Sequence, residues 1–378
     1  MPELEYRESR SDSVDSTIDR RLENGTIDTY ESQGGLGAGN NGSVRRFESQ
    51  TGLERYAVKR PLDPSPVELG VLKLEGELFK KVYPNEEVLF KATSNSDGRL
   101  VMPLFPGGNF HETLKKYPNR IGEIIVAVAL ELQRVHGKGV IHGDIKYDNV
   151  IIEEKNGVFN AKFVDFGWAY KNPGEARTIT SQCPYWATER TQTKIKLKAD
   201  TSQDVFSFGW MLSFAHRTAK KIPKEFHPFI INSQSKNPQQ RPNLKLFLKT
   251  NLRPILGEHY SSLAIANIES YQAMRAIGLS KPYIKKAFDN PEKFAQMQAL
   301  GLNKAYTEKA FDNPEQFAQM QDLGLNKAYT QKAFDNPEQF AQMQALGLNK
   351  AYTQKAFDNP EQFAQMQDQS LGLNKAYI

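Results

Sequence analysis

The most regular hydrophobic pattern in this chain of 378 residues is a repeat in its C-terminal third. An asparagine recurs every 23 residues, and the sequence between successive asparagines is almost identical in the middle units. A fixed period of this length is typical of stacked helical repeats. We therefore expect residues 257–378 to form an α-helical repeat array, with units starting near Asn267, Asn290, Asn313, Asn336 and Asn359.

Each unit of the array predicts two short helices. Asn313 is placed to cap the first helix, Phe317 and Met320 lie on one apolar stripe, and Gly324 ends it. Asn326 is placed to cap the second helix. Helices this short are marginal alone, so neighbouring units must stack and bury their apolar stripes against one another.

Residues 31–256 alternate short apolar runs with helical patterns. We expect a glycine-rich turn at 34–44, strands at 55–60 and 99–105, and helices at 68–82, 121–135 and 204–217. The last two helices are apolar on most faces, which predicts that they are buried. This order predicts an α+β fold with two lobes, a small β-rich one followed by a largely helical one.

The first thirty residues have a different composition. They are rich in Ser, Asp, Glu and Arg without apolar periodicity, so we expect residues 1–30 to be a disordered polar arm. The N-terminus lacks the apolar core of a signal peptide, and no run of eighteen apolar residues occurs. We therefore expect no transmembrane segment. The single cysteine, Cys183, permits no intramolecular disulfide, which favours a cytoplasmic location.

The charge of the chain is concentrated in its middle block. Residues 31–256 carry 33 basic and 23 acidic side chains, a balance that favours acidic partners. Lys194, Lys196 and Lys198 alternate along one segment and could bind an inositol phosphate or a lipid headgroup. A solvated run of charge is the alternative interpretation, and we favour it.

Two short runs carry the candidate chemistry. The first is HGDIKYDN at 142–149, and the second is DFG at 165–167. Phosphoryl transfer needs a carboxylate near the acceptor hydroxyl, a lysine and metal ligands, and these runs contain all of them. Upstream, residues 37–44 fit the pattern G-x-G-x-x-G-x-V, a glycine-rich hairpin whose backbone amides can approach phosphate oxygens.

With these motifs in this order, residues 31–256 resemble the eukaryotic-type protein kinase family. The resemblance implies that Lys59 contacts the nucleotide phosphates and pairs with a glutamate of the following helix. We choose Glu75, because Leu78, Phe79 and Val82 then face the sheet, whereas Glu68 lies too early and Glu77 displaces that stripe. The implied nucleotide-binding residues are Gly37, Gly39, Gly42, Val44, Ala57, Lys59, Glu75, Met102, Phe105 and Ile151.

The resemblance also implies the catalytic roles. Asp144 would accept the proton of the acceptor hydroxyl, and Lys146 would neutralise the γ-phosphate of ATP. Asn149 and Asp165 would hold Mg²⁺ or Mn²⁺ through hard oxygen ligands. Asp204 would support the catalytic loop.

Three features depart from the family pattern. Gly143 stands where many regulated kinases have an arginine that binds a phosphorylated residue, which argues against that form of switching. The run QCPY at 182–185 lacks the threonine that commonly supports Asp144 and Lys146 in serine/threonine kinases. The segment between Asp204 and Arg241 is also short, which predicts a reduced substrate-docking region.

The resulting hypothesis is an ATP-dependent serine/threonine protein kinase whose repeat array recruits a protein substrate, partner or activator. One alternative is a kinase-fold scaffold with little transfer activity, and another is a kinase of small molecules or lipids. Near-identical repeats on a divergent kinase domain also suggest an effector that an intracellular bacterium delivers into the host cytosol.

Overall fold

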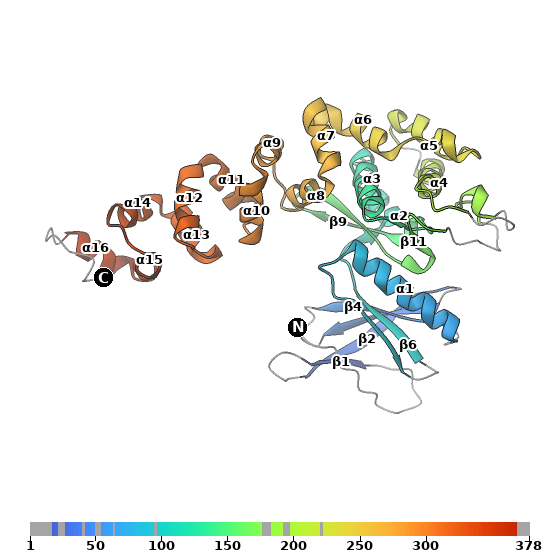
Figure 1. The fold of residues 1–378 in the computed structure, drawn as a ribbon, viewed down its shortest axis with the longest axis horizontal. Coiled ribbons are helices and arrows are strands. Elements are labelled where there is room, and N and C mark those ends of the chain that lie inside the picture. The colour runs from blue at the N-terminus through green and yellow to red at the C-terminus, as the bar shows by residue number, and fades with distance from the viewer. Residues whose placement is uncertain are drawn as a thin grey trace. The chain divides into compact units, whose positions relative to one another are not determined.

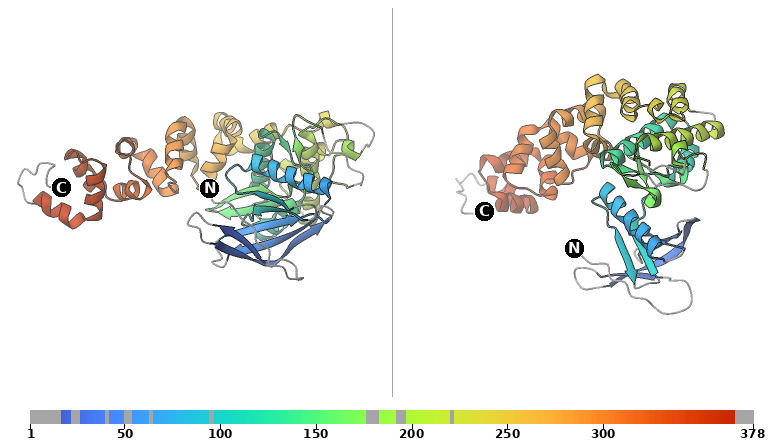
Figure 2. Two further views of the ribbon diagram at one scale, coloured as in Figure 1. Left: turned by 60° about the horizontal axis from the view of Figure 1, so that its bottom comes forward. Right: turned by 45° about the vertical axis from the view of Figure 1, so that its right-hand side comes forward.

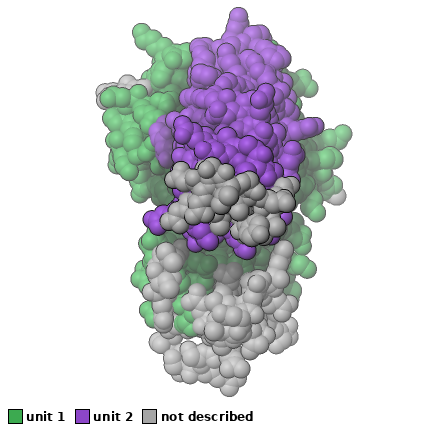
Figure 3. Space-filling view, turned by 90° about the vertical axis from the view of Figure 1, so that its left-hand side faces the viewer, with its two compact units in different colours: residues 1–155, 159–251 green, residues 156–158, 252–378 purple. Residues whose placement is uncertain are grey.

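The structure is a computed structural model that describes residues 17–21, 27–39, 42–49, 54–62, 65–93, 97–175, 183–191, 197–219 and 222–368. The chain divides into two compact units. The first comprises residues 1–155 and 159–251, and the second comprises residues 156–158 and 252–378 (Figure 3). The division falls at residue 252, within a helix, and not at residue 257 as we expected.

An antiparallel sheet of six strands forms the N-terminal part of the first unit (Figure 1). Its strand order is β1-β2-β3-β4-β6-β5. Apolar side chains of β2, β3, β4 and β6 form a small core on one face of the sheet. The strands are β1 (Thr17–Arg21), β2 (Ile27–Gly39), β3 (Gly42–Ser49), β4 (Arg55–Arg60), β5 (Leu89–Thr93) and β6 (Asp97–Pro103).

The start of this sheet differs from the predicted disordered arm. Within residues 1–30, β1 pairs with the first half of β2, and Tyr30 is fully buried. A strand is held by backbone hydrogen bonds, so a polar edge strand can form without a continuous apolar stripe. Residues 1–16 and 22–26 lie outside the described ranges.

Helix α1 (Pro66–Val82) follows β4 and packs on the sheet through β6. The Ser65 side chain caps its first turn by accepting from the backbone N–H of Glu68, and proline occupies the first helical position. Its buried residues are Leu72, Glu75, Gly76, Leu78, Phe79 and Val82, which confirms the stripe expected from the sequence. One ionisable group, Glu75, therefore lies on the apolar face of the helix.

The rest of the first unit is mainly helical. Buried helices α3 (Ile121–Gly137) and α4 (Ser202–Ala219) form its centre, as the sequence predicted. Between α4 and Arg241, the described residues (222–240) form the seven-residue helix α5 (His227–Ser233) and short 3-10 turns. The remaining elements are α2 (Phe110–Lys116), α6 (Leu244–Leu256), β7 (Gly108–Asn109), β8 (Val140–Ile141), β9 (Val150–Lys155), β10 (Val158–Phe163) and β11 (Tyr170–Lys171).

The second unit is a succession of short paired helices (Figure 2). Two helices form each 23-residue unit, which confirms the predicted helical array. The helices are α7 (Glu258–Ala266), α8 (Ile268–Ala276), α9 (Lys281–Asp289), α10 (Pro291–Ala299), α11 (Lys304–Asp312), α12 (Pro314–Asp322), α13 (Lys327–Asp335), α14 (Pro337–Ala345), α15 (Lys350–Asp358) and α16 (Pro360–Asp368). None of the helices in the described ranges has the length and apolar character needed to cross a bilayer.

The two asparagines predicted as caps behave differently. The side chain of Asn326 accepts a hydrogen bond from the backbone N–H of Tyr329 and caps α13 as expected. Asn313 instead donates its side-chain amide to the Lys309 carbonyl at the end of the preceding helix, and its side chain makes no capping bond to α12. Asn313 is the single residue between α11 and α12. Its side chain therefore binds an unpaired carbonyl at the end of α11 in place of a free amide at the start of α12.

A polar contact recurs between successive units. Tyr306 of α11 donates its hydroxyl to Asp335 of α13 at 2.6 Å, and Lys309 contacts the same carboxylate at 2.8 Å. The same triplet joins α9 to α11 and α13 to α15. Each such contact is exposed, so it contributes little stability by itself. It fixes the register with which one unit stacks on the next.

Buried aromatic residues should supply most of the array's stability. Phe340 is 1% exposed and its ring lies parallel to that of Phe357 in the next helix. We predict that Phe340→Ala lowers the free energy of unfolding by about 3–5 kcal/mol, because it removes a buried ring and leaves a cavity. Denaturant unfolding of the full chain followed by circular dichroism measures the change.

Gln342→Ala provides the matched control, since Gln342 is exposed two residues along the same helix. Its unfolding curve should coincide with that of the unaltered chain. A loss of equal size in both variants would contradict the assignment of stability to the buried stripe.

Candidate active site

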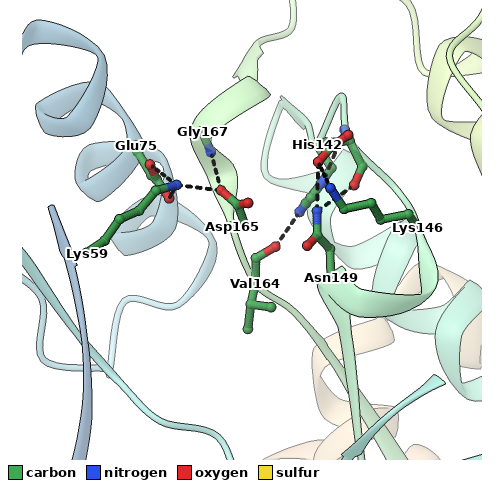
Figure 4. A network of polar contacts seen from close by, with 9 residues as sticks. Lys59, Glu75, His142, Lys146, Asn149, Val164, Asp165 and Gly167 are labelled. Carbon is green, nitrogen blue, oxygen red and sulfur yellow. Dashed lines mark hydrogen bonds and ion pairs between the residues drawn. The ribbon is translucent and has the colours of Figure 1, made fainter. Parts of the chain in front are cut away.

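Lys59 of β4 lies at the centre of a buried cluster of charges (Figure 4). Its ammonium is 2.9 Å from both carboxylate oxygens of Glu75 and 2.6 Å from Oδ1 of Asp165. Lys59 and Glu75 are 3% and 1% exposed. Burial lowers the pKa of Lys59, but the charges of the two carboxylates outweigh it, and the pKa is raised above its usual range. Lys59 is therefore a permanent cation.

Asp165 follows β10 and lies in the left-handed region of backbone conformation, with φ of 61°. Its Oδ1 accepts hydrogen bonds from Lys59 and from the backbone N–H of Gly167. Burial raises the pKa of this carboxyl, but the adjacent ammonium outweighs it and the pKa is lowered. A left-handed conformation is costly for a residue with a side chain, so the surrounding contacts must hold it.

Phe166 fixes the position of Asp165 relative to α1. Its ring is buried 5.7 Å from that of Phe79 in α1 and 4.8 Å from the imidazole of His142. Edge-to-face and tilted pairs at these distances are favourable. The helix that carries Glu75 and the loop that carries Asp165 are thus packed together through one aromatic side chain.

The second half of the site is the loop from His142 to Asn149. Asp144 is 2% exposed, and its Oδ2 lies 2.9 Å from both Lys146 Nζ and Asn149 Nδ2. Asn149 Nδ2 also donates to the Asp144 carbonyl. Burial lowers the pKa of Lys146, but the charge of Asp144 outweighs it and the pKa is raised. Lys146 and Asp144 therefore form an ion pair.

Asp204 at the start of α4 supports this loop. The backbone N–H groups of His142 and Gly143 donate to its two oxygens at 2.8 and 2.9 Å, and His136 Nε2 lies 2.9 Å from the same carboxylate. Burial raises the pKa of Asp204, but these contacts outweigh it and the pKa is lowered. The backbone before Asp144 is thereby fixed by a buried carboxylate.

The strands on either side of the glycine-rich segment pair as a hairpin, as predicted. Gly37 pairs with Val44 and Gly39 with Gly42, and residues 40–41 lie outside the described residues. Gly42 has φ of +130°, and a Cβ there would lie 2.0 Å from the Arg60 carbonyl oxygen. Only glycine fits at this position.

The structure places the proposed base-binding residues on four strands and on the segment after β6, with Val44 on β3. Ala57 of β4 pairs with Met102 of β6, and Ile151 lies on β9. The ring of Phe105 packs against Phe79, with centroids 5.9 Å apart. Of these residues Met102 is buried, whereas Ala57 and Ile151 are half-buried.

Asn149 and Asp165 are the two residues expected from the sequence to hold a divalent metal. The Asn149 amide nitrogen is held by Asp144, and its amide oxygen lies on the side that faces Asp165 (Figure 4). The second carboxylate oxygen of Asp165 points toward the same space. One amide and one carboxylate oxygen fit a hard cation such as Mg²⁺.

Comparison with known proteins agrees with this arrangement. A family model described as "Protein kinase domain" matches residues 30–218, half of the chain. The chain belongs to the protein kinase family. The bilobal fold expected from the sequence is therefore confirmed.

Three relatives show how distant the similarity is. The chain is 33% identical to "cAMP-dependent protein kinase type 3" of Saccharomyces cerevisiae over 30% of its own length and 28% of the relative's. It is 30% identical to "Calcium-dependent protein kinase 8" of Oryza sativa subsp. japonica, over 48% and 36%. It is 30% identical to "Cytokinesis protein sepH" of Aspergillus niger, over 46% and 13%. The chain thus spans only about a third or less of these relatives.

The sequence missed two residues of the kinase site. Trp186 donates its indole N–H to Oδ1 of Asp144 at 3.1 Å, and Arg190 donates to the Gly143 carbonyl. Both lie in the segment between Asp165 and α4, of which residues 176–182 and 192–196 lie outside the described ranges. No local pattern predicts either contact, because the partners are more than forty residues apart in the chain.

A pH dependence follows from His142, whose Nε2 lies 3.0 Å from the Val164 carbonyl and whose Nδ1 accepts from the Asp144 N–H. Burial lowers the pKa of His142 below its usual 6.5. As the pH decreases, the histidine of the unfolded chain is therefore protonated before that of the folded chain. The contribution of His142 to the free energy of unfolding is fully present above about pH 6.5 and is lost below it, by up to about 1.4 kcal/mol per pH unit.

Unfolding free energies between pH 7.5 and 5.5 test this dependence. His142→Gln should flatten the pH slope relative to the unaltered chain. His259→Gln should keep the original slope, since His259 is an exposed residue of the second unit. Parallel slopes for His142→Gln and the unaltered chain would refute the role of His142.

Proposed function

We propose that this protein kinase transfers the γ-phosphate of ATP to serine or threonine hydroxyls of a protein substrate. The observation that supports transfer most strongly is the complete set of polar contacts in one site: Lys59 with Glu75 and Asp165, and Asp144 with Lys146 and Asn149. Lys146, two residues after Asp144, favours serine or threonine over tyrosine.

The nucleotide would lie between the glycine hairpin and the segment after β6. Ala57, Val44 and Ile151 would contact the base, and the N–H of Phe105 would bind it. All three N–H groups of Lys59 are directed at carboxylate oxygens, so binding a phosphate requires one contact to be exchanged. The contact to Asp165 is the one to exchange, because Asp165 would then be free to hold the metal.

The metal, Mg²⁺ or Mn²⁺, would be held by Asn149 and Asp165 and, when bound, neutralises charge on the phosphates. Lys146 would bind a γ-phosphate oxygen while it keeps its contact with Asp144. Asp144 would orient the acceptor hydroxyl and accept its proton late in transfer.

The ion pairs also bear on the two alternatives. A scaffold without transfer has no use for a buried cation held by two carboxylates, and burying such charges is costly. The short region after α4 is equally consistent with a kinase of small molecules or lipids, so it does not distinguish the two classes of acceptor. Detection of phosphate on protein side chains distinguishes them.

The repeat array is our candidate for recruiting a substrate, partner or activator in the cytoplasm, including a host cytoplasm. Its exposed side chains recur in register, as with Gln319 and Gln342 on successive units. Such a regular face suits an extended partner. An anionic ligand at the alternating lysines is a weaker proposal, since Lys194 and Lys196 lie outside the described residues and only Lys198 is seen, exposed.

Transfer of labelled γ-phosphate tests the proposed function. We expect Asp144→Asn to lower kcat by about 10²- to 10⁴-fold, because no carboxylate then takes the proton from the substrate hydroxyl. Asp165→Asn should abolish transfer, because it removes the carboxylate proposed to hold Mg²⁺ or Mn²⁺. Autophosphorylation and a generic protein substrate are the two readouts, with phosphoamino-acid analysis of the product.

Asp322→Asn is the matched control, since Asp322 is an exposed residue of α12. Its activity should equal that of the unaltered chain. Absence of transfer in the unaltered chain with ATP still bound, both alone and with cell extract added as a source of activator, would refute the proposal in favour of the scaffold.

A further inference from the structure

The carboxylate of Asp144 receives hydrogen bonds at both of its oxygens. Lys146 and Asn149 contact Oδ2 from within the same loop. The third donor is the indole N–H of Trp186, which contacts Oδ1 from a segment 42 residues further along the chain. Because donors act on both oxygens, the plane of the carboxylate cannot rotate without breaking a contact.

Trp186 lies where the family's usual support is missing. It directly follows the run QCPY, which lacks the threonine expected to contact Asp144 and Lys146. The indole is 6% exposed, and its ring packs 5.3 Å from Trp168 and 5.7 Å from Tyr185. A buried indole N–H requires an acceptor, and here the acceptor is the proposed base itself.

Arg190 links the indole to the backbone of the catalytic loop. It is 1% exposed and donates to the Gly143 carbonyl, while its guanidinium lies 5.9 Å from the Trp186 ring. Gly143 has φ of +76°, and a Cβ there would be 2.4 Å from the Trp168 carbonyl oxygen. Arg190 thus contacts both the peptide before Asp144 and the indole ring of Trp186, which binds the Asp144 carboxylate.

We propose that Trp186 is a positioning residue for Asp144 and that Arg190 holds it in place. The inference rests on the proposed transfer reaction. In that reaction the acceptor oxygen bonds to the γ-phosphorus, the bond from phosphorus to the bridging oxygen of ADP breaks, and the acceptor proton passes to Asp144. Oδ1 has one protein donor and Oδ2 has two, so Oδ1 has the free lone pair for that proton.

Kinetics of Trp186→Phe separate this role from simple packing. The variant keeps a ring and removes only the N–H donor and part of the indole. We expect kcat to fall by about 10- to 100-fold, the range for one hydrogen bond to a charged group, with the KM for ATP unchanged. A merely structural role would lower thermal stability and leave kcat of the folded enzyme unaltered.

Trp210→Phe is the matched control. Trp210 belongs to the same row of rings, 5.6 Å from Tyr185, and it stacks on Phe214. Its kcat should equal that of the unaltered chain. Equal kcat in Trp186→Phe and the unaltered chain, or equal losses in the two variants, would overturn the proposal while leaving the transfer reaction intact.

The hydrogen bond itself is measurable without turnover. The chain has three tryptophans, so ¹H–¹⁵N spectra contain three indole signals, which Trp→Phe variants assign. Asp144→Ala should shift the Trp186 signal and leave that of Trp210 in place. An unmoved Trp186 signal would overturn the proposal. If the unaltered chain transfers no phosphate, the proposed function fails, and the positioning role fails with it even where the signal shifts.

Discussion

The burial of Lys59 between Glu75 and Asp165 is the interaction on which the rest of the kinase unit depends. An ammonium removed from water is strongly destabilising unless carboxylates accept all of its hydrogen bonds. The two acceptors come from different elements, one from α1 and one from the segment after β10. The sheet, the helix and the loop must therefore adopt a single relative arrangement. That arrangement also fits the chemistry, because a cation next to an ionised Asp165 is what a phosphate and a metal require.

The catalytic loop follows the same principle with backbone groups. Asp204 accepts from two successive backbone N–H groups, and His142 uses one ring nitrogen within the loop and the other on the Val164 carbonyl. A fully satisfied buried network of this kind has one favourable geometry, since any displacement leaves a polar group without a partner. Asp144 extends from this fixed backbone, and its carboxylate is oriented by contacts from Lys146, Asn149 and Trp186. Contacts that extend from Asp204 of α4 to the carboxylate oxygens of Asp144 thus preorganise the loop.

The repeat array is built by different means. Its helices are too short to be stable alone, so buried rings such as Phe340 and fully buried methionines such as Met343 join successive helices. The exposed contacts from Tyr306 and Lys309 to Asp335 then set the register between units. Because neighbours interact through identical contacts, the same geometry can recur along the chain.

The sequence by itself determined the elements whose signals are local. The strand at Arg55–Arg60, the helices α1, α3 and α4, and the 23-residue period of the array follow from local apolar patterns and from the repeat itself. The choice of Glu75 over Glu68 and Glu77 also followed, because helical spacing decides which glutamate shares a face with Phe79. Only the tertiary structure decided that β1 pairs with β2, that Asn313 binds the helix before it, and that Trp186 contacts Asp144. Those contacts depend on which groups other segments leave unpaired nearby, and chain folding alone brings such groups together.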